Sequence, residues 1–204
     1  MEYRELAIAG AFEITPKQHG DPRGVFLEAF KAPAFAHYVG HNFNLAQVNC
    51  STSAAGTVRG IHFAQVPPGQ AKYVTCPRGA LLDVIVDIRV GSPTFGQYDT
   101  VLLDDDTRRA VYLPEGLGHG FMALEDMTTA MYFQTSGFNP EREFGVHPLD
   151  PTIGIEWPTK DRAGNPIKPL LSDKDAKAPS LAEAAAQSLL PNYDAVRRYV
   201  KSLG

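Results

Sequence analysis

Cysteine is scarce in this 204-residue chain, which carries only Cys50 and Cys76. Neither residue belongs to a Cys-x-x-Cys pair or to a Cys/His cluster, so the cysteines give little support to a zinc site. Both lie in apolar, strand-like stretches. We therefore expect two buried free thiols of a reducing compartment rather than a disulfide.

A long apolar run is also missing. The stretch "ALLDVIVDI" is interrupted by Asp83 and Asp87, and it is far too short to span a membrane. The first residues, "MEYRELAIAGAFEI", hold early acidic residues and no long apolar core, which is unlike a signal peptide. We expect a cytoplasmic protein that contacts no membrane.

A surplus of positive charge is the third absence. The chain has 19 Lys and Arg against 23 Asp and Glu, which gives a net charge of -4 at pH 7. A grip on nucleic acid that ignores sequence requires many basic residues on one face. The composition therefore predicts no nucleic-acid partner.

Short β-rich runs separated by turns fill most of the chain. Turn clusters such as "VPPGQ", "VGSPTFG" and "LDDDTR" separate the runs. Eight runs have strand character: "GVFLEAF", "NLAQVNCS", "TVRGIHFA", "AKYVTC", "LLDVIVDIRV", "YDTVLLD", "RAVYLP" and "TAMYFQTS". Strands at this spacing, with few helices between them, predict a β-sandwich or barrel. In "LLDVIVDIR" the even-numbered positions are all apolar, which predicts one dry face and one wetter face that carries Asp83, Asp87 and Arg89.

The character of the sequence changes near residue 180. In "PSLAEAAAQSLL", Glu183 follows Ser180 by three places, which is the capping-box spacing of a helix start. Pro191 ends this helix, and "YDAVRRYVKSL" predicts a second short one. We divide the chain into a domain of residues 1–179 and a helical tail of residues 180–204 that packs on it.

Three basic residues, Arg59, His62 and Lys72, occur within strand-like sequence. Arg and Lys are rarely buried without a partner, so a basic cluster on a sheet face implies an anion or a carbonyl ligand. Such a cluster requires that their strands run side by side, joined by the "VPPGQ" turn. Ion pairs with Asp83 and Asp87 are the alternative explanation.

His119 lies between Gly118 and Gly120 in "YLPEGLGHGFMAL". The glycines permit a bulge or a close approach of the backbone to a ligand. A histidine in such a run is more often a core residue, but a second histidine, His62, on a similar strand favours a shared site. Two distant histidines make a poor metal site, so we expect no metal.

Eight segments occur in the order found in dTDP-4-dehydrorhamnose 3,5-epimerases: "GDPRGVF", "VRGIHF", "QAKYV", "DVIVDIRVGSPTFG", "LPEGLGHGF", "MYF", "DPTIGIEWP" and "LSDKDAKAP". The sequence resembles this family from about residue 3 to residue 191. The variants "PPGQAKY" and "SLLP" are similar to the actinobacterial branch, which also holds epimerases of antibiotic deoxysugar pathways. The resemblance implies an all-β cupin jelly roll with short C-terminal helices. It implies a homodimer without metal or other cofactor that acts on a dTDP-linked 4-keto-6-deoxyhexose.

The resemblance assigns the proton chemistry to four residues. His62 is the base that removes the acidic hydrogens beside the C4 ketone, and Asp175, rather than Asp173, orients its imidazole. Lys72 stabilises the enolate oxygen, and Tyr132 is the acid on the opposite face of the sugar.

Nine further residues are expected to contact the substrate. Arg23 meets the diphosphate from the partner subunit, Phe26 stacks on the thymine, and Glu28 bonds to it. The others are expected around the sugar, the phosphates and the cavity wall: Gln47, Asn49, Arg59, His119, Phe138 and Arg142.

Phe138, in "GFNP", departs from the family pattern, which commonly has a second tyrosine six residues after the first. The missing hydroxyl leaves open whether both C3 and C5 are inverted. We expect the 3,5-epimerase, and a single-centre epimerase of a deoxysugar pathway is the alternative. A non-catalytic sugar-nucleotide binding module and a metal-dependent cupin enzyme are hypotheses from other classes.

Overall fold

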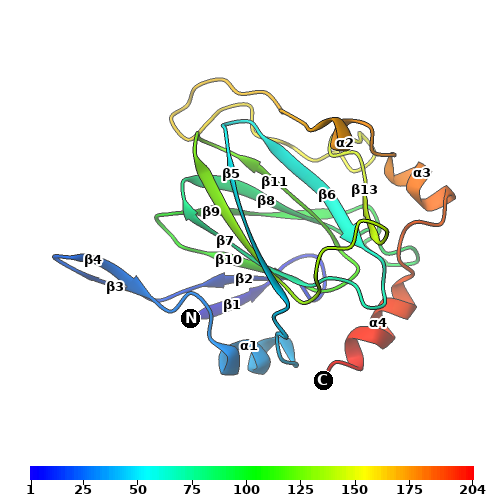
Figure 1. Cartoon of the computed structure of the whole chain (residues 1–204), viewed down its shortest axis with the longest axis horizontal. Coiled ribbons are helices and arrows are strands. Elements are labelled where there is room, and N and C mark those ends of the chain that lie inside the picture. Colours follow the sequence, from blue (N-terminus) through cyan, green and yellow to red (C-terminus); the bar gives the residue numbers. More distant parts are fainter.

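Two antiparallel β-sheets pack face to face in the computed structural model, which describes all residues 1–204 (Figure 1). The six-stranded sheet consists of β1 (Glu2–Glu5), β2 (Phe12–Thr15), β10 (Ala110–Leu113), β7 (Lys72–Arg78), β12 (Thr128–Gln134) and β5 (Gln47–Ser53), in that order. The five-stranded sheet consists of β13 (Glu143–Gly145), β6 (Val58–Ala64), β11 (Gly118–Ala123), β8 (Ala80–Val86) and β9 (Tyr98–Asp104). The predicted β-sandwich is confirmed, and each of the eight β-rich runs contains a strand.

Outside the two sheets lie a hairpin and four short helices. The hairpin consists of β3 (Gln18–Asp21) and β4 (Gly24–Leu27), and it projects away from the sandwich (Figure 1). The helices are α1 (Ala32–Val39), α2 (Asp173–Ala176), α3 (Leu181–Ala186) and α4 (Tyr193–Lys201). None of these helices has the length and apolar character that crossing a membrane requires.

The main core fills the space between the two sheets. It is a cluster of 14 buried apolar residues, with Val74 and Val111 on one sheet and Leu81, Ile85 and Phe121 on the other. Complete burial of each such side chain stabilises the fold by roughly 1.5–3 kcal/mol. This cluster holds the sheets together and leaves room for a polar cavity beside it.

Strand β8 is covered on both faces, which corrects the predicted wet face. Leu81 and Ile85 point between the sheets, while Val84 and Val86 pack outward against a second apolar cluster that contains Leu181 of α3. Asp83 lies on the interior face with Leu81 and Ile85 and is fully buried, and Asp87, just after the strand, is fully buried as well. Alternation in the sequence separated the two faces correctly, but it did not show that α3 covers the even one.

The C-terminal helices begin where the sequence predicted. The Ser180 hydroxyl accepts a hydrogen bond from the backbone N–H of Glu183, and the Glu183 carboxylate accepts one from the backbone N–H of Ser180. This capping box is confirmed, as is the second helix after Pro191, which Asn192 caps. The division of the chain at residue 180 stays a prediction.

The two cysteines differ in exposure. Both are free thiols, and Cys76 is buried as expected. Cys50 is exposed, so its predicted burial is wrong. It lies on β5, the edge strand of its sheet.

Strand β6 contains a bulge that places Arg59 and His62 on one face. The β6–β11 pairing matches His62 with His119 and Arg59 with Phe121, so β6 contains one more residue than β11 over this interval. Side chains three positions apart would otherwise point to opposite faces of a strand. The bulge therefore turns both basic side chains toward the interior of the sandwich.

Lys72 approaches this group from the other sheet. Its strand, β7, pairs with β10 and β12, whereas β6 pairs with β11 and β13. The prediction that β6 and β7 run side by side is therefore wrong. The "VPPGQ" segment crosses between the sheets, so the basic residues face one another instead of sharing one sheet face.

Gly60 makes the bulge possible, and Gly60→Ala tests this. Gly60 has a φ of 120°, and a Cβ there would lie 2.5 Å from the carbonyl oxygen of His119. Gly24 has a similar φ of 132° but open space around it, so Gly24→Ala is the matched control. We expect Gly60→Ala to lower the free energy of unfolding by about 2 kcal/mol more than the control does, because the backbone clash adds to the shared strain. Denaturant unfolding measures the difference, and equal losses in the two variants would contradict this reading of the bulge.

Candidate active site

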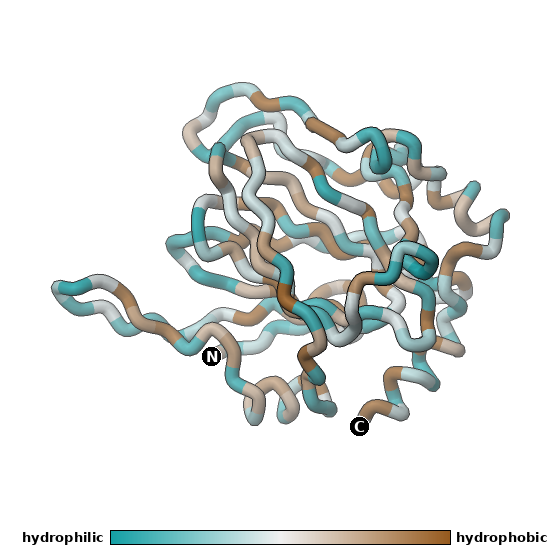
Figure 2. Tube along the Cα trace, in the orientation of Figure 1, coloured by the Kyte–Doolittle hydropathy of each residue, from teal (hydrophilic) through white to brown (hydrophobic).

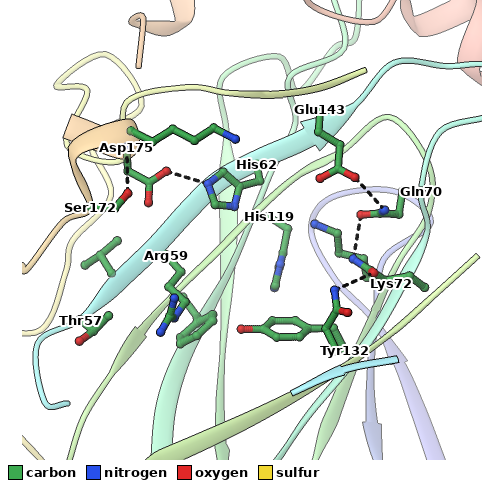
Figure 3. Close-up of a pocket in the computed structure, with 15 residues that line it drawn as sticks. Thr57, Arg59, His62, Gln70, Lys72, His119, Tyr132, Glu143, Ser172 and Asp175 are labelled. Atoms are coloured by element: carbon green, nitrogen blue, oxygen red, sulfur yellow. Dashed lines mark hydrogen bonds and ion pairs between the residues drawn. The ribbon is translucent and has the colours of Figure 1, made fainter. Parts of the chain in front are cut away.

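A cavity of about 310 Å³ opens between the sheets, and polar side chains line most of it. Of its 15 lining residues only three are hydrophobic. Figure 3 shows His62 and Asp175 on one side of it, Tyr132 on the other, and Lys72 approaching from a third direction. Polar groups that converge inside an apolar sandwich lose hydration on folding, so they are better explained by a bound ligand than by stability.

A hydrogen bond joins His62 to Asp175. Nε2 of His62 lies 2.7 Å from Oδ1 of Asp175, whose side chain is almost fully buried. Burial alone would raise the pKa of Asp175, but the bonds to His62 and to Ser172 outweigh it and hold the pKa below its ordinary value. The ionised carboxylate therefore accepts the Nε2 proton of His62, which leaves Nδ1 as a free acceptor.

A second histidine–carboxylate pair lies deeper in the sandwich. Nε2 of His119 lies 2.9 Å from Oδ2 of Asp83, and both side chains are buried. Burial lowers the pKa of His119 although the charge of Asp83 opposes the shift, so the imidazole is neutral near pH 7. Asp83 thus pairs with His119 and not with the basic cluster, and Asp87 pairs with Arg89 at 2.8 Å. The two acids do not form the predicted alternative ion pairs.

Lys72 is buried, and its ammonium has no hydrogen-bond partner within the protein. Burial lowers the pKa of Lys72 to about 8, while the charges of Glu143 and Asp83 act in the opposite direction. At pH 7 the side chain is therefore mostly a cation, and its donors are free for a ligand. A cation in a poorly hydrated cavity stabilises a developing oxyanion far more strongly than a cation in water does.

Tyr132 is held on the opposite wall. Its hydroxyl lies 2.6 Å from Oγ of Ser51 on the edge strand β5. Burial raises the pKa of Tyr132 to about 12, although the bond to Ser51 and the charge of Arg59 act against the increase. The phenol is therefore protonated at neutral pH and can donate its proton.

These side chains form an acid–base arrangement across an open space. The free nitrogen of His62 and the phenol of Tyr132 come from different sheets, and the ammonium of Lys72 lies on the Tyr132 side. A proton acceptor, a proton donor on the facing wall and a cation are the groups that proton transfer beside a carbonyl requires. Arg59, whose Nε donates to Oγ of Ser53 at 3.1 Å, adds a second positive charge.

Seven of the thirteen predicted site residues line the cavity: Asn49, Arg59, His62, Lys72, His119, Tyr132 and Asp175. Three others lie on or beside the projecting hairpin and outside the cavity: Arg23, Phe26 and Glu28. Arg23 pairs there with Asp21, and Glu28 pairs with Lys31.

The remaining three predicted residues, Gln47, Phe138 and Arg142, are not among those that line the cavity. Gln47 bonds to Asn49 at 2.8 Å, and its Oε1 accepts the backbone N–H of Phe138. The Phe138 ring itself is 61% exposed. Arg142 donates to the backbone carbonyl of Pro67 and is directed to that loop.

Eight lining residues were missed by the sequence analysis: Thr57, Val58, Gln70, Phe121, Gln134, Glu143, Ser172 and Lys174. Strand alternation could have found three of them. Gln70, Phe121 and Gln134 each lie two positions from a predicted residue and so share its face. Glu143 gave no such signal because β13 has only three residues.

Metal ligands do not gather anywhere in the chain. No group of three or more His, Cys, Asp or Glu side chains is arranged to hold a metal ion. The two site histidines are each engaged by a different carboxylate.

Comparison with known proteins agrees with this arrangement. Residues 5–183 match the family model described as dTDP-4-dehydrorhamnose 3,5-epimerase. The dTDP-4-dehydrorhamnose 3,5-epimerase of Mycolicibacterium smegmatis is 55% identical over 203 residues, which cover 100% of this chain and 97% of the relative. The dTDP-4-dehydrorhamnose 3-epimerase of Streptomyces niveus is 54% identical over 193 residues, or 95% of this chain and 90% of the relative.

Solved structures share the whole fold. The rmlC epimerase of Mycobacterium tuberculosis superimposes with a TM-score of 0.96 at 49% identity, and the match covers 100% of both chains. The 3'-monoepimerase ChmJ of Streptomyces bikiniensis, in complex with dTDP-quinovose, gives a TM-score of 0.92 at 47% identity over 97% of each chain.

The resemblance seen in the eight sequence segments is therefore confirmed across nearly the entire length. Relatives with one and with two inverted centres match almost equally well, so the matches establish the shared chemistry and not the number of centres. This chain belongs to the dTDP-4-dehydrorhamnose 3,5-epimerase family, and it is a dTDP-sugar epimerase, an isomerase.

Proposed function

We propose that this enzyme inverts both C3 and C5 of a dTDP-linked 4-keto-6-deoxyhexose and is thus a dTDP-4-dehydrorhamnose 3,5-epimerase. The observation that carries the epimerase chemistry is the placement of His62 and Tyr132 on facing walls, with Lys72 beside the space between them (Figure 3), and the sequence segments shared with the 3,5-epimerases favour two centres. A base and an acid on opposite faces of one sugar ring are what inversion requires, because the proton must return from the other side.

In the proposed mechanism, Nδ1 of His62 removes the proton from C3. The electron pair of the C–H bond forms a C3–C4 double bond, and the negative charge of the resulting enolate lies on O4. Lys72 stabilises the enolate oxygen, and Asp175 stabilises the imidazolium that His62 becomes. The Tyr132 hydroxyl then protonates the same carbon from the opposite face. The imidazolium loses its proton to water and the phenolate regains one, and the cycle repeats at C5.

A single-centre 3-epimerase is the second candidate. Phe138 stands where the family commonly has a tyrosine, and its exposed ring offers no hydroxyl to a bound sugar. The Streptomyces niveus relative and ChmJ are both described as acting at one centre. The cavity residues that handle protons are the same under either candidate.

We further propose a homodimer in which the β3–β4 hairpin reaches the partner's cavity. A lone two-stranded hairpin is only marginally stable, yet this one projects with Val25 57% and Phe26 69% exposed. Apolar segments on the hairpin are visible in Figure 2, outside the sandwich. Exposed apolar side chains on a projecting element favour a protein interface, and Arg23 at the tip would supply positive charge for a diphosphate.

We also propose that the enzyme works in the cytoplasm. The exposed thiol of Cys50 and the buried thiol of Cys76 are both free. Free thiols persist most readily in a reducing compartment.

Solvent exchange tests the number of inverted centres. The enzyme is incubated with dTDP-4-keto-6-deoxyglucose in deuterated water, and proton NMR follows the signals of H3 and H5. We expect both signals to disappear, because each inversion returns a deuteron from the solvent to the carbon. Exchange at C3 alone would support the 3-epimerase, and nucleotide binding without any exchange would contradict an epimerase.

Two substitutions test the separate roles of base and acid. We expect His62→Ala to reduce exchange at both carbons by about 10²- to 10⁴-fold, the contribution of a general base, while dTDP binding survives. We expect Tyr132→Phe to suppress net inversion more than exchange, since the imidazolium of His62 can exchange its proton with the solvent and return a deuteron to the same face. His37→Ala, on α1 and outside the cavity, is the control. Equal loss of exchange in the His62 and Tyr132 variants would argue against separate roles.

Sedimentation tests the proposed dimer. We expect the wild-type chain to sediment as a dimer, and a Val25→Asp/Phe26→Asp variant to sediment as a monomer with weakened dTDP binding. Leu149→Asp changes a residue that is 43% exposed elsewhere on the surface and should leave the dimer intact. A wild-type enzyme that is monomeric while it turns over substrate would refute the proposed arrangement.

A further inference from the structure

Four side-chain amides form a continuous hydrogen-bonded chain along one wall of the cavity. Nε2 of Gln47 donates to Asn49 at 2.8 Å, Nδ2 of Asn49 donates to Gln134 at 3.1 Å, and Nε2 of Gln134 donates to Gln70 at 2.9 Å. Nε2 of Gln70 lies 3.4 Å from Oε1 of Glu143. Figure 3 draws the link between Gln70 and Glu143.

Both ends of this amide chain fix its direction. At one end the backbone N–H of Phe138, which can only donate, bonds to Oε1 of Gln47 at 2.9 Å. At the other end Gln70 faces a carboxylate and, at 3.3 Å, the carbonyl oxygen of Ser136, which can only accept. Reversing any one amide would set donor against donor or acceptor against acceptor, so only one orientation satisfies every link.

The amide chain is closely associated with Lys72. Gln134 is the residue opposite Lys72 in the β7–β12 register, and Gln70, two positions before Lys72, lines the same cavity. Gln70 is only 8% exposed and Gln134 only 7%. A buried amide that loses its hydrogen-bond partner destabilises the fold, which favours the single satisfied arrangement.

Glu143 is the carboxylate that the amide chain holds in place. Its Oε1 accepts from Gln70 and from the backbone N–H of Asn139 at 3.1 Å, while the residue lines the cavity with Lys72. Three charged or titratable groups act on the Lys72 ammonium: Glu143 from β13, Asp83 from β8 and His119 from β11. Of these three groups, only Glu143 accepts a hydrogen bond from the amide chain.

We propose that Gln70 and Gln134 are positioning residues, and that the directed amide chain they complete fixes the Glu143 carboxylate where it supports the Lys72 cation. The amide chain connects the two sheets, because Gln134 belongs to the six-stranded sheet and Glu143, at its end, belongs to the five-stranded one. The position of the Glu143 carboxylate on one sheet therefore depends on the orientation of the Gln134 amide on the other. The effect on turnover rests on the proposed function, whereas the effect on Lys72 does not.

The first test measures the titration of Lys72 directly in the ligand-free protein. Carbon-13 NMR of the lysine Cε signals gives the midpoint, and Lys72→Met identifies the resonance. We expect a midpoint near pH 8 in the wild type. In Gln70→Met and Gln134→Met we expect a midpoint about half a unit lower, because a loosened Glu143 stabilises the ammonium less. Gln65→Met is the matched control, since Gln65 is exposed and makes no side-chain hydrogen bond, and it should leave the midpoint unchanged.

The second test is the pH profile of epimerisation. At a pH well above the Lys72 midpoint, a midpoint half a unit lower leaves the variant with about one third of the wild-type fraction of charged Lys72. We therefore expect kcat to fall about threefold at pH 9. At pH 6 kcat should be nearly unchanged, and KM should stay within twofold because the enolate charge exists only after proton removal. A purely structural defect would lower the melting temperature without moving the alkaline limb.

The outcomes separate cleanly. If neither Met variant folds, Gln70→Asn keeps an amide but shortens the link, and the same fall in the midpoint is expected. An unchanged Lys72 midpoint in the folded variants, or an equal shift in Gln65→Met, would overturn the positioning role. Because the NMR titration needs no substrate, it stands even if the deuterium experiment rejects the proposed reaction.

Discussion

The hydrogen bond between His62 and Asp175 joins two segments that are 113 residues apart and organises the site. Asp175 lies in the first turn of α2. The Ser172 hydroxyl caps this turn by accepting a hydrogen bond from the backbone N–H of Asp175. The imidazole is delivered by the bulged strand β6. The bond fixes which imidazole nitrogen carries the proton, so the C-terminal segment determines the chemistry of a residue in the sheet.

A polar cavity inside a sandwich imposes a cost that the rest of the fold must offset. The apolar cluster between the sheets and the two clusters on their outer faces supply this support. Burial then shifts the titration of the site residues: it lowers the pKa of Lys72 and His119 and raises that of Tyr132. This desolvation keeps His119 neutral and the Tyr132 phenol protonated, whereas the charges of Glu143 and Asp83 counter its effect on the Lys72 cation.

Strand periodicity and turn residues were sufficient to predict the sandwich and the capped C-terminal helices. Family resemblance, rather than periodicity, brought His62, Lys72, Tyr132 and Asp175 together, since no local pattern links residues so far apart. The sequence did not reveal that β6 and β7 belong to different sheets, because a Pro-rich turn serves a hairpin and a crossover equally well. Nor did it reveal Glu143, whose strand is too short to show alternation.

The central claim is that one sugar ring lies between the imidazole of His62 and the phenol of Tyr132. A crystal structure of the enzyme with a non-reacting dTDP-6-deoxyhexose bound tests this most directly. The account predicts that Nδ1 of His62 and the Tyr132 hydroxyl approach opposite faces of the ring, with the C4 oxygen at hydrogen-bond distance from the Lys72 ammonium. A ring with both side chains on the same face, or with its C4 oxygen directed away from Lys72, would contradict the account.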